Sequence, residues 1–282
     1  MILIKGKRKM RKKLYFVLAI FLILAPFLTG CNNANHVKTL RVGVRDNIVN
    51  FGYLNEISGK YYGLEVDIAT ELANRLGYGN VEFTTVTPDN RKQMLLDGNV
   101  DCLIACYSIS DTRIENFDFS PAYYTDNICI MVENSSMIEK IEDLQNKKIG
   151  VMSGSNTAPI LAIKLQEIGM IQGELGSKVT GVEALSDTDE ATVFNGMYFK
   201  KENNYNALSD DLEVGTVDAV AMDGAITKTY KNDERNILDF NVSEQQYGVA
   251  TQKGSELSAQ VSEKIQEMLD DGTIEVLKDK WD

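Results

Sequence analysis

The chain has 282 residues, with 41 acidic side chains against 29 basic ones, so its formal net charge is -12 at pH 7. This acidic balance excludes the basic surface on which nucleic-acid binding depends, and no nucleic-acid partner is expected. The only histidine, His36, lies in a polar run that we interpret as a tether, which excludes histidine-dependent catalytic triads and histidine metal clusters from the folded part.

The N-terminal segment has the features of an export signal. Residues 1–30 contain seven basic side chains and no acid, followed by an apolar stretch that is short for a membrane span. Leu28-Thr29-Gly30-Cys31 resembles a bacterial lipobox, which implies cleavage before Cys31 and lipidation of that residue. We expect a signal peptide at 1–30 and a tether at 31–38 that holds the protein at the extracytoplasmic face of the cell membrane. An uncleaved anchor helix is the alternative.

The next part of the chain alternates between strand and helix patterns. Apolar residues recur every four positions from Leu64 to Leu76, which predicts a helix, and Glu65 and Asp67 are expected on its solvent side. Strands are predicted at 40–44, 81–86 and 100–106, with a second helix at 90–96. A β-α-β-α-β order of this kind indicates a mostly parallel sheet.

A second unit with α/β character begins after Asn127. Strands are predicted at 148–152 and 217–222, and the turn 153–157 leads into a helix that ends at Ile168. Residues 173–204 are polar and without periodicity, and we expect a surface excursion there. The chain ends with a strand at 247–251 and an amphipathic helix that Gly272 stops.

Three cysteines follow Cys31, an odd number that no disulfide framework fully consumes: Cys102, Cys106 and Cys129. Cys102 and Cys106 lie four residues apart in the apolar segment 100–106, which favours buried inert thiols over a redox or metal role. We predict no metal and no cofactor.

Several ordered segments carry a resemblance to a known family. They include Gly63-Leu64-Glu65-Val66-Asp67, Ser108-Ile109-Ser110-Asp111-Thr112-Arg113, Phe117-Asp118-Phe119-Ser120-Pro121, and Gln246-Tyr247-Gly248-Val249-Ala250. Together they resemble the bacterial extracellular solute-binding proteins of family 3, which serve polar amino-acid importers. The resemblance implies a two-lobed periplasmic-binding-protein-like type II fold: 39–126 with 247–282 as lobe 1, 127–241 as lobe 2, and 242–246 as the return hinge. A monomer that delivers a free amino acid to ABC permease subunits is expected.

The same resemblance implies roles for individual residues. Arg113 matches the arginine that clamps the ligand α-carboxylate, assisted by Ser108, and the backbone at Cys106 matches a group that receives the ligand ammonium. Asp223 matches the second-lobe acceptor for that ammonium. The turn residues Ser153, Ser155 and Asn156 match those that close over the carboxylate. An exposed arginine at a helix start and a helix N-cap are the alternative readings of Arg113 and Asp223.

Two further arginines bear on ligand specificity. Arg45 and Arg91 match cations of relatives that take aspartate or glutamate, so an acidic amino acid is the favoured ligand. Simple pairing with neighbouring acids (Asp46, Asp89 and Asp97) is the alternative. Aromatic residues are expected to wall the ligand, namely Tyr53, Tyr62 and Tyr107, with Phe51 in the core.

Two other functions remain open for this fold. Some dehydratases that act on cyclic amino-acid precursors resemble the family, which would make the chain a cyclohexadienyl or arogenate dehydratase-like enzyme. A sensory ligand-binding lipoprotein is the second. Without a histidine in the folded part, an enzyme of this kind would need a carboxylate or a tyrosine for proton transfer.

Overall fold

The computed structural model describes residues 38–171, 192–194 and 197–282, and the compact unit considered below begins at Lys38. The predicted signal peptide, the lipidated Cys31 and the tether as far as residue 37 lie outside the described residues. Within the described ranges, no helix is both long and apolar enough to span a membrane.

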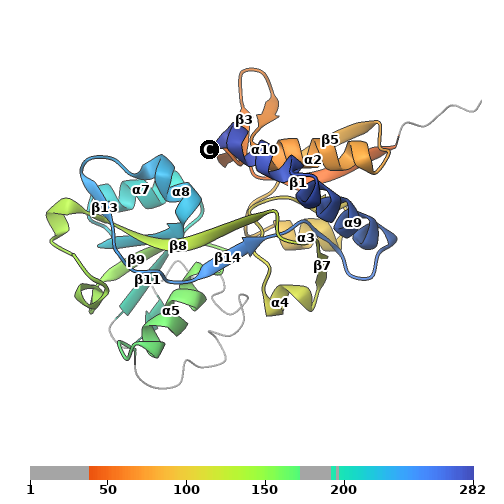
Figure 1. The fold of residues 1–282 in the computed structure, drawn as a ribbon. Coiled ribbons are helices and arrows are strands. Elements are labelled where there is room, and N and C mark those ends of the chain that lie inside the picture. Colours follow the sequence, from red (N-terminus) through yellow and green to blue (C-terminus); the bar gives the residue numbers. More distant parts are fainter. Residues whose placement is uncertain (1–37, 172–191, 195–196) are drawn as a thin grey trace, which may run out of the picture. The chain divides into compact units, whose positions relative to one another are not determined.

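The first sheet has the strand order β5-β1-β6-β15-β7, in which β5, β1 and β6 run parallel and β15 runs antiparallel to both of its neighbours. These strands are β1 (Thr39–Val44), β5 (Asn80–Thr85), β6 (Cys102–Leu103), β7 (Phe117–Phe119) and β15 (Ala250–Gln252). Strands β5, β1 and β7 are labelled in Figure 1. Strand β1 pairs in parallel with β5 and β6, as the predicted β-α-β-α-β order requires. Strand β6 is shorter than predicted, and Cys106 beyond it adopts a left-handed backbone conformation with φ of 46°.

The helices of this part are α2 (Leu64–Arg75), α3 (Arg91–Leu96), α4 (Asp111–Ile114), α9 (Glu256–Asp270) and α10 (Thr273–Trp281). In α2, Leu64, Ile68 and Leu72 are buried in the core against β1, as their spacing predicts. The solvent-facing position predicted for Glu65 is wrong, because its side chain is fully buried. Asp67 accepts hydrogen bonds from Lys280 and from the indole Nε1 of Trp281, both at 2.6 Å, which ties α10 to α2.

The second sheet is also mixed, with the order β10-β11-β9-β12-β8-β13. Its strands are β8 (Tyr124–Glu133), β9 (Lys148–Met152), β10 (Thr192–Phe194), β11 (Met197–Glu202), β12 (Ala219–Asp223) and β13 (Arg235–Ile237), and its helices include α5 (Thr157–Glu167), α7 (Tyr205–Glu213) and α8 (Gly224–Tyr230). The expectation of a surface excursion is wrong for 197–202. That segment is β11, which pairs in parallel with β9 and buries Phe199. Residues 172–191 lie outside the described ranges.

Two antiparallel strands connect the sheets. Strand β8 runs beside β14 (Glu244–Tyr247) (Figure 1). In this pair Tyr124 lies opposite Tyr247 and Asn127 opposite Glu244. The Tyr124 and Tyr247 rings stack 5.9 Å apart, and Phe51 packs edge-on against Tyr124. The strand predicted at 247–251 is therefore divided between β14 and β15, and both chain crossings share one hydrogen-bonded ribbon.

The entry into α2 depends on a glycine. Gly63 has φ of 130°, and a Cβ there would lie 2.1 Å from the carbonyl oxygen of Phe51. Replacing Gly63 with alanine should lower the free energy of unfolding by roughly 1–3 kcal/mol more than Gly77→Ala, because strain of this kind depends on contact with fixed backbone. Gly77 is the matched control, since its φ is also positive, at 76°, and its Cβ would meet nothing within 4 Å. Urea unfolding measures both, and equal losses would contradict the assignment.

Candidate functional site

A pocket lies where residues from both sheets meet. Its lining comprises Arg45, Pro88, Arg91, Cys106, Ser108, Arg113, Ser155, Asn156, Thr157, Tyr205, Asp223 and Gln245. Most of these follow the carboxyl ends of β1, β6, β9, β11 and β12, which is where α/β sheets generally place ligand sites. Arg113 and Asp223, predicted to act together from opposite halves of the chain, line the same pocket.

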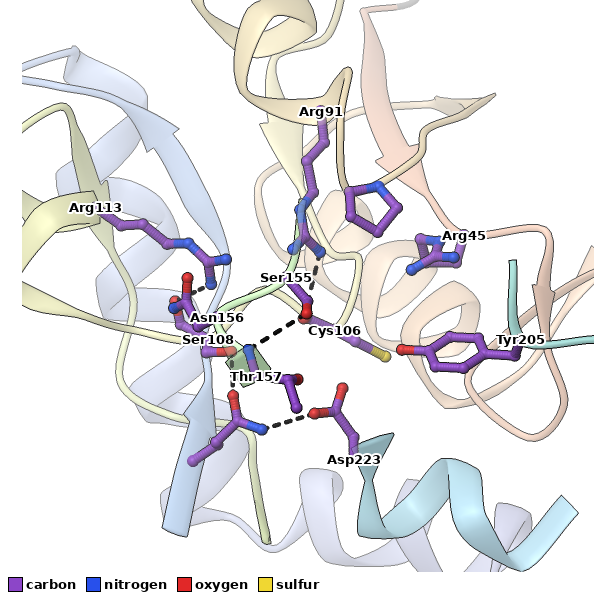
Figure 2. Close-up of a pocket in the computed structure, with 12 residues that line it drawn as sticks. Arg45, Arg91, Cys106, Ser108, Arg113, Ser155, Asn156, Thr157, Tyr205 and Asp223 are labelled. Carbon is purple, nitrogen blue, oxygen red and sulfur yellow. Dashed lines mark hydrogen bonds between the residues drawn. The ribbon is translucent and has the colours of Figure 1, made fainter. Parts of the chain in front are cut away.

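Three arginine side chains project toward this pocket (Figure 2). Arg45, Arg91 and Arg113 are only 3%, 3% and 6% exposed, so Arg113 is not the exposed helix-start arginine of the alternative reading. Arg113 donates to the carbonyl of Ser108 at 2.8 Å, Arg91 to that of Ala105 at 2.8 Å, and Arg45 to Asn47 Oδ1 at 3.0 Å.

No carboxylate of the described residues forms an ion pair with these guanidinium groups. The ion pairs found there use other arginines and lysines, so the alternative in which Arg45 and Arg91 pair with neighbouring acids is not what the structure contains. The Nε atoms of Arg45 and Arg91 are buried, and no described residue forms a hydrogen bond with them. Desolvated cations with spare donors make this wall of the pocket suited to an anionic ligand.

Tyr107 supports two of the arginines from behind. The guanidinium carbons of Arg91 and Arg113 lie 4.4 and 4.2 Å from the centre of its ring, so the ring packs against both cations. Tyr107 is buried and does not line the pocket, so it is a positioning group and not a wall. Burial lowers the pKa of Arg113 to about 9, and the neighbouring charge of Arg91 acts in the same direction.

Asp223 supplies a negative charge facing the arginines. Its Oδ1 accepts a hydrogen bond from Gln245 Nε2 at 2.7 Å, and Gln245 Oε1 in turn accepts from Ser108 Oγ at 2.8 Å. Burial raises the pKa of Asp223, and the nearby charge of Asp126 adds to this effect. Asp223 occupies the N-cap position of α8 without a side-chain capping bond, because the Asp126 carboxylate accepts the Ala225 N–H instead, at 3.1 Å.

The predicted turn after β9 contributes only in part. Ser155 and Asn156 line the pocket beside Thr157, the first residue of α5. Asn156 is 5% exposed, and its Oδ1 is buried without a partner among the described residues. Ser153 lies outside the lining and donates from its Oγ to Asp89 at 3.0 Å.

The aromatic wall differs from the predicted one. Tyr53 and Tyr62 are each 42% exposed on the small sheet of β2 (Asn47–Ile48), β3 (Gly52–Asn55) and β4 (Lys60–Tyr62), and neither lines the pocket. Tyr205, which was not predicted from the sequence, starts α7, and its ring centre lies 6.0 Å from the guanidinium carbon of Arg45. Asn204 caps that helix and was the available signal, since Tyr205 follows it directly.

The pocket contains buried cations and one carboxylate, and residues that follow strands of both sheets line it. Such a pocket is typical of a protein that binds a small charged solute. The chain belongs to the bacterial extracellular solute-binding proteins, family 3, whose model matches residues 40–282. The resemblance and the two-lobed α/β fold predicted from the sequence are confirmed.

Sequence and structural similarity to individual known proteins supports this family assignment. The chain is 30% identical over 258 residues to the L-cystine-binding protein TcyJ of Escherichia coli K12, covering 89% of this chain and 85% of that protein. An ancestral arginine-binding protein bound to arginine is 30% identical, with a TM-score of 0.67, covering 87% of this chain and 99% of that one. The ancestral amino acid-binding protein AncCDT-1, a precursor of cyclohexadienyl dehydratase, is 26% identical with a TM-score of 0.68, covering 86% and 95%.

The raised pKa of Asp223 has a consequence for stability. A carboxyl group whose pKa is raised on folding binds more protons in the native state, so the stability that it contributes is present at low pH and is lost as pH rises through its folded pKa. Asp223→Asn should therefore make the ligand-free protein more stable near pH 7 and leave it nearly unchanged near pH 4. Chemical unfolding at both pH values measures this. The control is Asp218→Asn in the loop before β12, and equal pH profiles for Asp223→Asn and the unmodified protein would contradict the expectation.

Proposed function

We propose that this protein is the amino-acid-binding component of an ABC importer and that its ligand is an acidic amino acid, aspartate or glutamate. The observation that carries the proposal is the convergence on a single pocket of one carboxylate and three buried guanidinium groups that form no ion pair with the described residues. An acidic amino acid carries two carboxylates and one ammonium group, so each charge of the ligand would meet an opposite charge of the protein.

Each residue has a role in this proposal. Arg113 binds the α-carboxylate, with Ser108 at its side, because its fork of N–H donors matches a carboxylate. Asp223 accepts the ligand ammonium in addition to its bond from Gln245. Arg45 and Arg91 bind the distal carboxylate, and Tyr205 packs on the aliphatic part of the ligand beside Arg45.

Binding is coupled to closure in the proposal. Arg45, Arg91 and Arg113 belong to the proposed lobe 1 (39–126 with 247–282), whereas Ser155, Asn156 and Asp223 belong to the proposed lobe 2 (127–241). A ligand held from both sides binds the closed form more tightly, and that difference in affinity drives closure about the β8–β14 ribbon and the return hinge at 242–246. The permease recognises the closed monomer, which a lipid on Cys31 holds at the extracytoplasmic face of the membrane.

L-Cystine is a second candidate ligand, because the relative TcyJ is a cystine-binding protein. Cystine carries two carboxylates and two ammonium groups, and so calls for a second carboxylate in the pocket. Asp223 alone provides one among the described lining residues. This charge count favours the acidic amino acids.

The dehydratase alternative draws on the similarity to AncCDT-1, which is itself described as an amino acid-binding protein. Its test is simple. The protein incubated with a cyclohexadienyl acid should leave that compound unchanged, and turnover would contradict the proposal.

A calorimetric panel tests the ligand. Protein freed of endogenous ligand is titrated with aspartate, glutamate, glutamine, asparagine, cystine and arginine. The two acids should bind most tightly. Binding of arginine without binding of either acid would contradict the roles of Arg45 and Arg91.

Variants separate the two carboxylate sites. Arg45→Met should weaken glutamate binding by roughly 3 kcal/mol, about 100-fold, and glutamine binding much less, because only glutamate carries the distal charge. Arg113→Met should weaken both ligands, since both share the α-carboxylate. Arg41→Met is the matched control, because Arg41 lies outside the pocket and pairs with Asp101. Equal losses of both ligands in Arg45→Met would contradict the assignment of Arg45.

A further inference from the structure

Glu65 is a fully buried carboxyl group directly behind the pocket. It lies in the first turn of α2, whose opening N–H groups donate to the carbonyls of Asn50 and Phe51 and so hold this turn in place. Its Oε1 accepts the backbone N–H of Cys106 at 2.6 Å and the hydroxyl of Tyr123 at 2.5 Å. Its Oε2 is buried and has no hydrogen-bond partner among the described residues.

A structural role alone does not require a carboxylate here. Holding the Cys106 N–H and the Tyr123 hydroxyl takes a single acceptor oxygen, which the amide of glutamine would supply without burying a charge. A buried carboxyl group with one oxygen unpartnered opposes folding, and an unsatisfied buried polar atom of this kind calls for an explanation. The two hydrogen bonds therefore do not explain why this position holds a glutamate and not a glutamine.

The surroundings of Glu65 connect it to the ligand-binding arginines. Cys106, whose N–H it holds, lines the pocket together with Arg45, Arg91 and Asp223. The titratable or charged groups that act on Glu65 are Tyr123, Cys106 and Arg45, and Arg45 is the one that favours its ionised form by charge. Beside it on α2, Asp67 is occupied by Lys280 and Trp281 of α10.

We propose that Glu65 is a positioning residue that acts through Arg45 and the Cys106 turn as a buried counter-charge to the arginine cluster, and thereby sets how strongly the pocket prefers an acidic amino acid to its neutral amide. This inference rests on the proposed amino-acid-binding function. With Asp223 and Glu65 both ionised, the three guanidinium groups leave one surplus positive charge. A ligand with two carboxylates and one ammonium cancels that surplus, whereas a glutamine ligand leaves it in place.

Removing the counter-charge should therefore strengthen the preference for the anion. Glu65→Gln keeps an acceptor for Cys106 and Tyr123 but removes the charge. The affinities for glutamate and glutamine, two ligands of nearly the same shape, are measured by calorimetry at pH 7.5 in Glu65→Gln and in the unmodified protein. We expect the ratio of the glutamine Kd to the glutamate Kd to rise about tenfold in the variant. A ratio within about twofold of the unmodified value would overturn the proposal.

A pH series provides the second measurement and does not depend on how well the variant folds. Burial raises the pKa of Glu65, so the ratio in the unmodified protein should rise as pH is lowered and Glu65 takes up a proton. Tyr123→Phe removes a hydrogen bond that lowers this pKa, so it should move the rise to higher pH without changing its size. The rise should be smaller in Glu65→Gln, where Asp223, whose pKa burial also raises, still titrates beside the arginines. The difference between the two pH series measures the contribution of Glu65.

The outcomes separate this inference from the proposed function. A ratio that does not change with pH in the unmodified protein would overturn the role of Glu65. A ratio below one in the unmodified protein would overturn the acidic ligand, and the shift produced by Glu65→Gln would still decide the role of Glu65.

Discussion

The arrangement of the site depends on the burial of three guanidinium groups without carboxylate partners among the described residues. Removing a charge from water opposes folding strongly, and proteins normally offset that loss with a paired charge or a full set of hydrogen bonds. Here Arg45, Arg91 and Arg113 receive partial compensation from backbone carbonyls, from Asn47 and from the face of Tyr107. The remaining electrostatic imbalance is what an anionic ligand would relieve.

The side chains around the three arginines hold their guanidinium groups in fixed positions. The Tyr107 ring packs against two of the cations, and the Phe119 ring packs against it at a tilt, with the ring centres 5.6 Å apart. A guanidinium held in this way loses little further side-chain entropy when a ligand arrives. Preorganisation therefore opposes the stability of the free protein and favours the complex, which is the usual exchange between stability and function at binding sites.

Much of the fold follows from patterns in the sequence, and the exceptions have identifiable causes. The spacing of Leu64, Ile68 and Leu72 predicts α2 because the helix buries one continuous face. The same reasoning misplaced Glu65, because local periodicity does not show that Cys106, forty-one residues later, returns beneath the first turn of this helix. Strand β11 was missed because a polar run precedes it and only its pairing with β9 identifies it as part of the sheet.

The candidate site was also only partly predictable from the sequence. A motif reveals Arg113, and the end of an apolar strand reveals Asp223, since both signals are local. The Asn204 cap marks the start of the helix at Tyr205 but does not show that this helix begins at the pocket, and the segment of Gln245 carries no pattern of its own. The three-dimensional arrangement is therefore what identifies both residues as pocket walls. Tyr53 and Tyr62 had the right residue type but belong to the small outer sheet.

Two aspartates, Asp126 and Asp223, lie at the same end of the second sheet and have different hydrogen-bond partners. Each could cap α8, and a single aspartate in both roles would have its oxygens held by helix amides and would be a weaker acceptor for a ligand. Asp126 takes the capping role by accepting from Ala225, and it also accepts the Tyr247 hydroxyl at 3.1 Å from the β14 crossing. Asp223 is left with its bond from Gln245, which extends to Ser108. The carboxylate that faces the arginines is thus hydrogen-bonded to a residue of β14, one of the two strands about which the lobes are proposed to close.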